Sequence, residues 1–173
     1  MNKVILYIAT SIDDFIADKN GGVDWLPSNE DPDDICGYKA LMKRISIIIM
    51  GSKSYKQILG FGDWAWKDKH TYVFSSKPHI HEHSNIEFVQ TDPKTFIDQL
   101  KIKQPNQDIW LLGGAELIAS FAKEKLIDEC VITIIPKSLN DGVKLELSLE
   151  EFDLVSEKSC MDSIIQKIYQ RKL

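Results

Sequence analysis

Two runs of apolar residues without polar alternation constrain the fold of this chain most strongly. They are Ile47-Ile48-Ile49-Met50 and Val131-Ile132-Thr133-Ile134-Ile135. Successive residues of a strand face opposite sides of a sheet, so a strand that is apolar throughout needs cover on both faces. Such strands are typical of parallel sheets with helices on either side. We therefore expect a three-layer α/β/α fold with a mixed, mainly parallel sheet.

The remaining elements alternate along the chain as this fold class requires. Further short strands are predicted at Val4–Thr10, Thr71–Phe74, Ile86–Val89 and Ile109–Leu112. Helices are predicted from Asp33 to Lys43, after the N-cap Asp92-Pro93, and from Ala115 to Lys125. Phe152–Lys158 and Ile164–Tyr169 indicate a C-terminal antiparallel hairpin. With 173 residues and no repeat or low-complexity linker, residues 1–173 are expected to form a single domain.

Composition excludes several classes of partner. The net charge is -5, with acids and bases interspersed, which argues against a nucleic-acid surface. No apolar run approaches the roughly 20 residues of a membrane span, and the N-terminus lacks a signal-peptide pattern. Cys36, Cys130 and Cys160 are odd in number and widely spaced, so neither a disulfide framework nor a zinc site is expected. These features together predict a cytoplasmic protein.

The strongest local signals are two glycine-containing turns between a strand and a helix. The first is Met50-Gly51-Ser52-Lys53-Ser54, and the second is Leu112-Gly113-Gly114-Ala115. Glycine lets a ligand approach the backbone closely, and the N-terminus of the following helix presents free N–H groups to it. If the two strands are neighbours, both turns lie at the carboxyl edge of the sheet, where open α/β sheets bind ligands. We therefore predict a nucleotide site, although neither a G-x-G-x-x-G nor a P-loop motif is present.

Several motifs, taken in order, resemble the dihydrofolate-reductase superfamily, and within it the branch of the riboflavin-biosynthesis reductase domain (RibD C-terminal type). The resemblance covers nearly the whole chain. Ala9-Thr10-Ser11-Ile12-Asp13-Asp14-Phe15-Ile16-Ala17 is similar to the opening of that branch, with Asp14 where glycine is usual. Asp24-Trp25-Leu26, Ile49 to Tyr55, Phe74 to Lys77 and Leu111 to Leu117 resemble its later motifs.

The resemblance implies NADPH as cofactor and a role for each matching residue. Ala9 and Ile16 would flank the nicotinamide, and Gly113 and Gly114 would lie beneath the ring and the pyrophosphate. Gly51, Lys53 and Ser54 would hold the pyrophosphate, and the cofactor site would also include Ser52, Leu112, Ala115 and Glu116. Ser75, Ser76 and Lys77 would lie by the adenosine ribose, where a 2′-phosphate would explain a preference for NADPH. Glu116 replaces an arginine frequent in folate reductases, which weakens the phosphate site.

The substrate is expected to be a small pyrimidine- or pteridine-like heterocycle. The resemblance matches Trp25 and Thr133 to substrate-side positions, and Asp34 is the candidate carboxylate for a ring. The pocket that the nicotinamide faces is expected to be lined by Tyr7, Ala9, Trp25, Tyr38, Tyr55 and Thr133. The activity most like this pattern is 5-amino-6-(5-phosphoribosylamino)uracil reductase, and relatives in this branch suggest a homodimer. A dihydrofolate reductase and a non-catalytic nucleotide-binding paralogue are the alternatives.

Three further interpretations concern loops. The segment from Asp14 to Asn29 is expected to act as a lid, with Gly21-Gly22 giving it mobility. Trp25, Trp64 and Trp66 could line a ring-binding cleft, but the favoured interpretation is that Trp64 and Trp66 cover a long surface loop. His79-Ile80-His81-Glu82-His83 could converge on a metal, but a solvated loop is the favoured interpretation, so no metal site is predicted.

Overall fold

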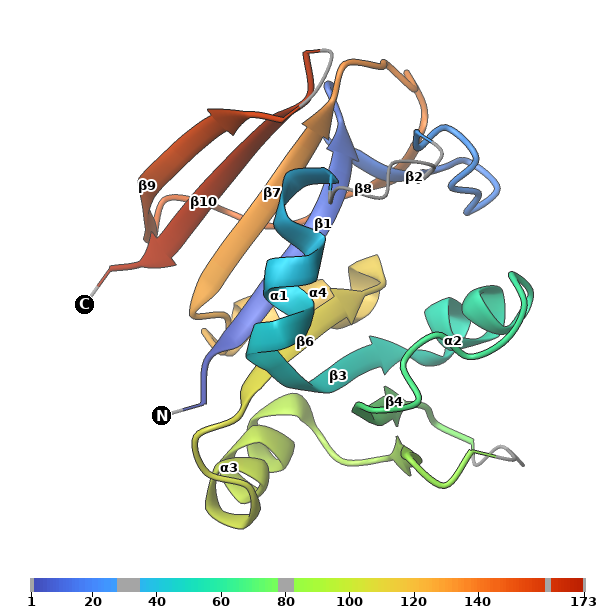
Figure 1. Ribbon diagram of the computed structural model, residues 1–173, viewed down its shortest axis with the longest axis vertical. Coiled ribbons are helices and arrows are strands. Elements are labelled where there is room, and N and C mark those ends of the chain that lie inside the picture. Colours follow the sequence, from blue (N-terminus) through green and yellow to red (C-terminus); the bar gives the residue numbers. More distant parts are fainter. Residues whose placement is uncertain (1, 28–34, 78–82, 161–162, 173) are drawn as a thin grey trace.

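The computed structural model describes residues 2–27, 35–77, 83–160 and 163–172. An eight-stranded sheet runs through the molecule in the order β5-β4-β3-β6-β1-β7-β10-β9 (Figure 1). Its strands are β1 Val4–Ser11, β3 Ile45–Gly51, β4 His70–Phe74, β5 Ile86–Val89, β6 Asp108–Gly113, β7 Glu129–Ile135, β9 Phe152–Ser159 and β10 Ile165–Arg171. The helices are α1 Tyr38–Arg44, α2 Ser52–Leu59, α3 Pro93–Lys103 and α4 Ala115–Lys123.

The pairing is parallel from β5 to β7, and β10 runs antiparallel to both β7 and β9. The mainly parallel sheet and the terminal hairpin are therefore confirmed. Each predicted strand lies within a residue or two of its observed position.

Two apolar cores, one on each face of the sheet, explain the absence of polar alternation. Ile47 and Ile49 pack with α3 and α4 in one core, which also holds Phe121. Ile48 and Met50 pack on the other face with residues of α1 and α2. Because both faces of β3 are covered, an apolar side chain is favoured at every one of these positions. The three-layer arrangement is confirmed.

The predicted helix from Asp33 to Lys43 is wrong at its start. The α-helix α1 begins only at Tyr38, after a short 3-10 turn, η1, at Ile35–Gly37. Cys36 and Gly37 have φ values of 58° and 82°, in the left-handed region that an α-helix does not use. Residues 28–34, which include Asp34, lie outside the described part of the chain.

The segment expected to be a mobile lid contains a strand. β2, Phe15–Asp18, pairs with β8, Gly142–Lys144, in a second, two-stranded sheet. After β2 the chain turns tightly, because the Asp18 carboxylate accepts hydrogen bonds from the N–H groups of Asn20 and Gly22 at 2.7 and 2.9 Å. Part of the expected lid is therefore regular structure fixed to the β7–β9 connection.

The expectation that the cysteines are unpaired is wrong for two of them. Cys36 and Cys160 form a disulfide that joins η1 to the end of β9. Their separation of 124 residues in sequence hid the pair, because only the fold brings the two Cα atoms to 5.4 Å. Cys130 is a buried free thiol, and burial raises its pKa to about 12. Among the described residues, no helix is long and apolar enough to cross a membrane.

Candidate functional site

The two glycine turns face each other at the carboxyl edge of the sheet. β3 and β6 are neighbours, and Met50 lies opposite Gly113 in their register. A Cβ placed on Gly51 would lie 3.8 Å from both the Gly113 oxygen and the Gly114 nitrogen. Gly113 has a φ of 123°, a conformation that residues with a side chain rarely adopt, and its peptide bond to Gly114 is cis. The expected juxtaposition of the two turns is therefore present.

Both helices that follow these turns begin without a side-chain cap. Gly51 is the N-cap of α2 and Gly114 is the N-cap of α4, and no side chain accepts a hydrogen bond from either first turn. In α3, by contrast, the Asp92 carboxylate accepts from the Thr95 N–H at 2.9 Å. Two adjacent helix N-termini with unsatisfied N–H groups form a site suited to an anion such as a pyrophosphate.

An ion pair links these two helix N-termini. The Lys53 Nζ on α2 lies 2.8 Å from a carboxylate oxygen of Glu116 on α4, and both side chains are 86% exposed. The hydrogen bond from Lys53 holds the pKa of Glu116 below its usual value. Glu116 therefore places a negative charge beside the N–H groups that an anionic ligand would use.

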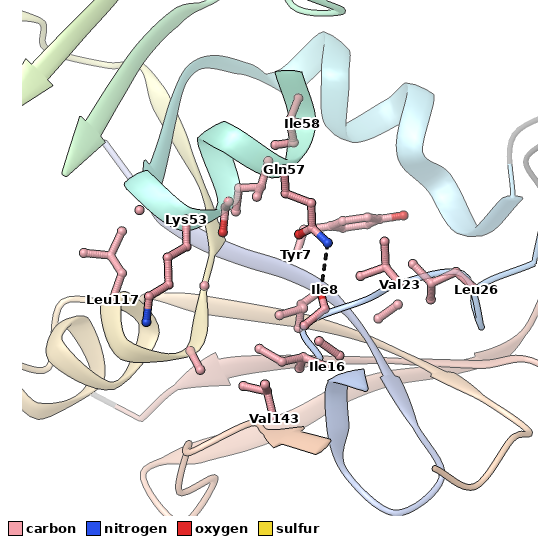
Figure 2. Close-up of a pocket in the computed structure, with 18 of the residues that line it drawn as sticks. Tyr7, Ile8, Ile16, Val23, Leu26, Lys53, Gln57, Ile58, Leu117 and Val143 are labelled. Atoms are coloured by element: carbon pink, nitrogen blue, oxygen red, sulfur yellow. Dashed lines mark hydrogen bonds between the residues drawn. The ribbon is translucent and has the colours of Figure 1, made fainter. Parts of the chain in front are cut away.

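A cavity of about 1410 Å³ opens beside the turns. Figure 2 shows Lys53 and Leu117 on one side of it and Tyr7, Val23 and Leu26 on the other. Its volume exceeds that of an ordinary small-molecule pocket, roughly 300–1,000 Å³. The cavity can therefore hold a dinucleotide together with a second small molecule.

The end of the cavity away from Lys53 has a wall of aromatic side chains. Four lining residues, Tyr7, Tyr38, Trp66 and Trp110, form this wall, and we call it the aromatic end. Trp110 contacts Tyr7, Tyr38 and Trp66 edge-on, with ring centroids 6.2, 6.1 and 5.3 Å apart. The Trp66 Nε1–H also donates to the Tyr38 hydroxyl at 2.9 Å. These contacts fix the rings in place, so the wall offers preformed flat surfaces.

Thr133 lies at the same end and is held by a buried amide. Gln166, on β10, pairs with Thr133 in the sheet register and is 2% exposed. Its Nε2 donates to the Thr133 Oγ1 at 3.1 Å and to the Cys36 carbonyl at 2.6 Å. The Tyr7 hydroxyl donates to that same carbonyl at 3.4 Å. Thr133, Gln166, Cys36 and Tyr7 therefore form one connected polar group behind the aromatic end.

A loop after β2 closes part of the cavity. Asn20, Gly21, Val23 and Leu26 of this loop line it. The Gln57 Nε2 on α2 donates to the Gly21 carbonyl at 2.8 Å, the bond dashed in Figure 2. The loop is thus bridged to the helix that begins at the Gly51 turn.

Most of the predicted site residues share this cavity. The lining includes Ala9, Ile16, Gly51, Ser52, Lys53, Ser54, Leu112, Gly114, Ala115, Glu116 and Thr133. Gly113 is buried and does not line it. Ser75, Ser76 and Lys77 follow the end of β4 and do not line the cavity; the Ser75 hydroxyl donates to the Lys77 carbonyl at 2.7 Å.

Two predicted pocket residues lie elsewhere. Trp25 is 8% exposed and packs in a separate core with Cys36, Ile135 and Ile164. Tyr55 is buried against Trp64 and Phe88. Their side chains fill the structure around the cavity rather than its lining.

Sequence reasoning predicted Tyr7 and Tyr38 in the pocket but missed other residues of the site. Trp64 is 2% exposed, in the core, and Trp66 lines the cavity, so the prediction that both cover a surface loop is wrong. Trp110 was hidden inside an apolar strand, where any large side chain suggests a core. Gln166 carried a weak signal, a single amide within a predicted edge hairpin. Of the histidine-rich segment, residues 79–82 lie outside the described residues, and no group of three or more metal-binding side chains occurs within those that are described.

Comparison with known proteins places this geometry in a family. The family model of the RibD C-terminal domain matches residues 2–156. The uncharacterized protein YwjB of Bacillus subtilis (strain 168) is 35% identical over 144 residues, which cover 83% of this chain and 82% of YwjB. A crystal structure named as a riboflavin biosynthesis protein, from Shewanella sp. PV-4, superposes with a TM-score of 0.86 and 34% identity over 99% of both chains.

A bifunctional enzyme shows the same fold at lower identity. It is the diaminohydroxyphosphoribosylaminopyrimidine deaminase/5-amino-6-(5-phosphoribosylamino)uracil reductase of Thermotoga maritima, with a TM-score of 0.71 and 14% identity. The match covers 99% of this chain and 57% of that enzyme. The family model matches most of the chain, and YwjB is more than 30% identical over most of its length. The chain therefore belongs to the RibD C-terminal domain family.

Proposed function

We propose that this protein is an NADPH-dependent reductase that transfers a hydride to a small nitrogen heterocycle. Within that class, the activity it most resembles is reduction of a ribosylaminopyrimidine, as in riboflavin biosynthesis. The observation that carries the proposal is the pair of uncapped helix N-termini, at Gly51 and Gly114, that meet at one edge of the cavity. Family membership supports the same reaction class.

The residues present fit a dinucleotide. The N–H groups at the starts of α2 and α4 would hold the pyrophosphate, with Lys53 and the hydroxyls of Ser52 and Ser54 beside it. Ala9 and Ile16 give an apolar lining further along the cavity, suited to the nicotinamide ring. When bound, NADPH supplies the hydride itself.

The protein's part is to orient the two reactants and to exclude water. The loop that Gln57 links to α2 covers the cavity on one side. The aromatic end would hold the heterocycle against the nicotinamide face, and the Thr133 hydroxyl would orient it through a hydrogen bond. No nucleophile is needed, because reduction by hydride forms no covalent enzyme intermediate.

Calorimetric titration with NADPH and NADH tests the cofactor directly. We expect tighter binding of NADPH, since Ser75, Ser76 and Lys77 lie at the end of β4, beside the Gly51 turn, where a 2′-phosphate would emerge. Lys77 is exposed, so Lys77→Ala should remove about 0.5–1 kcal/mol of the preference. Equal affinity for the two cofactors in the wild type would contradict this assignment.

NADPH oxidation by wild-type protein tests the substrate class. The ribosylaminopyrimidine should be offered in its phosphorylated and dephosphorylated forms, and dihydrofolate in parallel. We expect turnover with the pyrimidine and little with dihydrofolate. Robust turnover of dihydrofolate, lost in Asp34→Asn, would make the protein a folate reductase. NADPH binding without turnover of any of these compounds would favour a non-catalytic paralogue.

A further inference from the structure

The charged groups around the cavity are unevenly distributed. Among the described residues that line it, Lys53 is the one cation, and Asp63 and Glu116 are the acids. Lys53 is bound to Glu116 and lies across the cavity from Tyr7 in Figure 2. Within the described residues, no basic side chain therefore lines the cavity at the aromatic end. Asp63 lies three residues before Trp66, on the loop that supplies part of the aromatic wall.

The aromatic end lacks the groups that normally bind a phosphate ester. A phosphate ester carries a charge of about −1.5 to −2 at neutral pH and is normally held by arginine, lysine or a helix N-terminus. The two helix N-termini that line the cavity lie at the other end, with Lys53. Moving a dianion out of water without such partners is costly, and the Asp63 carboxylate would repel it.

The groups that are present suit a flat, unphosphorylated ring. The aromatic wall offers faces and edges on which a planar heterocycle can stack. Thr133 adds a directional contact. Because the Gln166 amide already donates to the Thr133 oxygen, the hydroxyl proton of Thr133 remains available to donate into the cavity. This position can therefore donate a hydrogen bond to an acceptor on the ligand, such as a ring carbonyl or a ring nitrogen.

We propose that the substrate of this protein is an unphosphorylated planar nitrogen heterocycle, neutral or cationic, that stacks in the aromatic end and accepts a hydrogen bond from Thr133. The proposal rests on the proposed function for the assignment of the other end to the cofactor. It separates this chain from reductases whose substrate carries a phosphate ester. Gln166 is then a positioning residue, which acts through Thr133.

A matched pair of probes tests the proposal by binding alone. 6-Ribitylaminouracil and its phosphate ester share one ring and differ by the phosphate. Each should be titrated calorimetrically into the protein, with and without saturating NADP⁺. We expect the unphosphorylated compound to bind about 10-fold tighter or more, a difference of about 1.4 kcal/mol. Tighter or equal binding of the ester, or no binding of either compound at millimolar concentration, would overturn the proposal.

Variants distinguish the contacts involved. Thr133→Val removes the hydroxyl at similar size and should lower the affinity for the unphosphorylated compound about 5- to 10-fold, the effect of one lost hydrogen bond. Thr133→Ser keeps a hydroxyl and should retain most of the wild-type affinity. Gln166→Leu should weaken the same compound, leaving NADPH affinity unchanged. If Thr133→Val binds the unphosphorylated compound as tightly as the wild type, Thr133 does not make the proposed contact.

One cation near the aromatic end, Lys158, is a candidate ligand for the phosphate of the ester. The Lys158 Nζ lies 3.6 Å from the position of a Cβ on Gly37, next to Cys36, but Lys158 does not line the cavity. If the ester binds tighter and Lys158→Ala abolishes that advantage, Lys158 is a phosphate ligand and the proposal fails. Failure of NADPH binding, measured separately, would instead contradict the proposed function and leave the ring-binding result standing.

Discussion

At the scale of single residues, the Gly51 and Gly113 turns differ in why they need glycine. Gly113 has a φ of 123°, so any side chain there strains the backbone, with or without a ligand. Gly51 has an ordinary φ of −82°, and a Cβ on it would make only normal contacts with the facing turn. The fold itself does not require glycine at position 51. Space for a ligand between the turns is the remaining reason for it.

Gly51→Ala therefore separates ligand binding from folding. We expect NADPH affinity to fall at least about 10-fold, because the added methyl would enter the gap between the turns, while the free energy of unfolding changes by less than about 1 kcal/mol. Calorimetry and urea unfolding measure the two effects. Gly60→Ala, at the other end of α2 and outside the cavity lining, is the control for an added methyl on this helix and should bind NADPH normally. Its Cβ would lie 3.1 Å from the Gln57 carbonyl oxygen, so its free energy of unfolding is measured as well. Normal NADPH binding by Gly51→Ala would mean that the gap is not the cofactor site.

Asp13 is a residue whose structural role depends on pH. Its carboxylate hydrogen-bonds to Ser11, to the Ser138 hydroxyl at 2.7 Å, and to the N–H groups of Leu139 and Asn140. These bonds hold the pKa of Asp13 well below its usual value. They connect the β1–β2 turn to the β7–β8 loop, and so fix the base of the small sheet beside the cavity.

Asp13 is predicted to contribute to acid sensitivity. Because its folded pKa is lowered, its stabilising effect is complete above the unfolded pKa of about 3.9 and is lost as the pH falls below that value. Asp13→Asn should lower the Tm at pH 7, and the difference from wild type should shrink between about pH 4 and pH 2. Thermal unfolding across this range checks it. A Tm difference that does not depend on pH would show that the carboxylate charge is not involved.

At the scale of elements, the apolar pattern predicted most of the sheet, because burial on both faces is a local property of each strand. Ile48 and Ile49 show this directly, since each faces a different core. The pattern also located the two turns, because a glycine that follows such a strand must lie at its carboxyl end. Pairings between short segments that lie far apart in the chain were not predictable. β2 and β8 have four and three residues and pair only through the folded arrangement of the chain.

Tyr7 and Tyr38 of the aromatic end were predicted to line the pocket, but its two tryptophans were missed for a related reason. Trp66 and Trp110 are brought together from a loop and a strand 44 residues apart in the chain, and each alone suggests ordinary packing. Trp25 was placed in the pocket by resemblance, but its side chain packs in a core with Cys36 and Ile164. A motif identifies a position in the chain, whereas the direction of a side chain depends on the local packing.

One ion pair joins the first turns of the helices α2 and α4. Removing its carboxylate should tighten cofactor binding. Glu116 presents a negative charge where a pyrophosphate would bind, and it also occupies Lys53. Glu116→Gln removes the repulsion and frees the lysine, so NADPH affinity should rise about 2- to 5-fold at low salt, in keeping with 0.3–1 kcal/mol for a charge at a helix N-terminus. Lys53→Met should lower it by a similar factor.

Ionic strength provides the control for both variants. The pair is highly exposed, so the differences between variants should shrink as salt rises. Weaker binding in Glu116→Gln would indicate that the carboxylate contributes a contact of its own, such as a hydrogen bond to a ribose hydroxyl. A cytoplasmic location and a homodimer remain predictions, and light scattering of the purified protein checks the second.

At the scale of the whole molecule, the Cys36–Cys160 disulfide connects parts that are far apart in sequence. It joins η1, ahead of α1, to the β9–β10 hairpin at the edge of the sheet. Cys36 also lines the cavity, and its carbonyl accepts from Gln166 and Tyr7. The bond therefore fixes the backbone on which the polar group behind the aromatic end is built.

We expect reduction of this disulfide to cost stability and to loosen the aromatic end. Closing a loop of this length restricts the unfolded chain, so Cys36→Ser with Cys160→Ser should lower the free energy of unfolding by about 2–4 kcal/mol relative to the oxidised protein. Affinity for 6-ribitylaminouracil should fall as well, because the Cys36 carbonyl is less firmly placed, while NADPH affinity, which depends on the α2 and α4 starts, should change little. Thiol titration of the denatured, unreduced protein should find one reactive group, Cys130. Three reactive thiols in protein purified without reductant, together with unchanged stability of the double variant, would contradict the pairing.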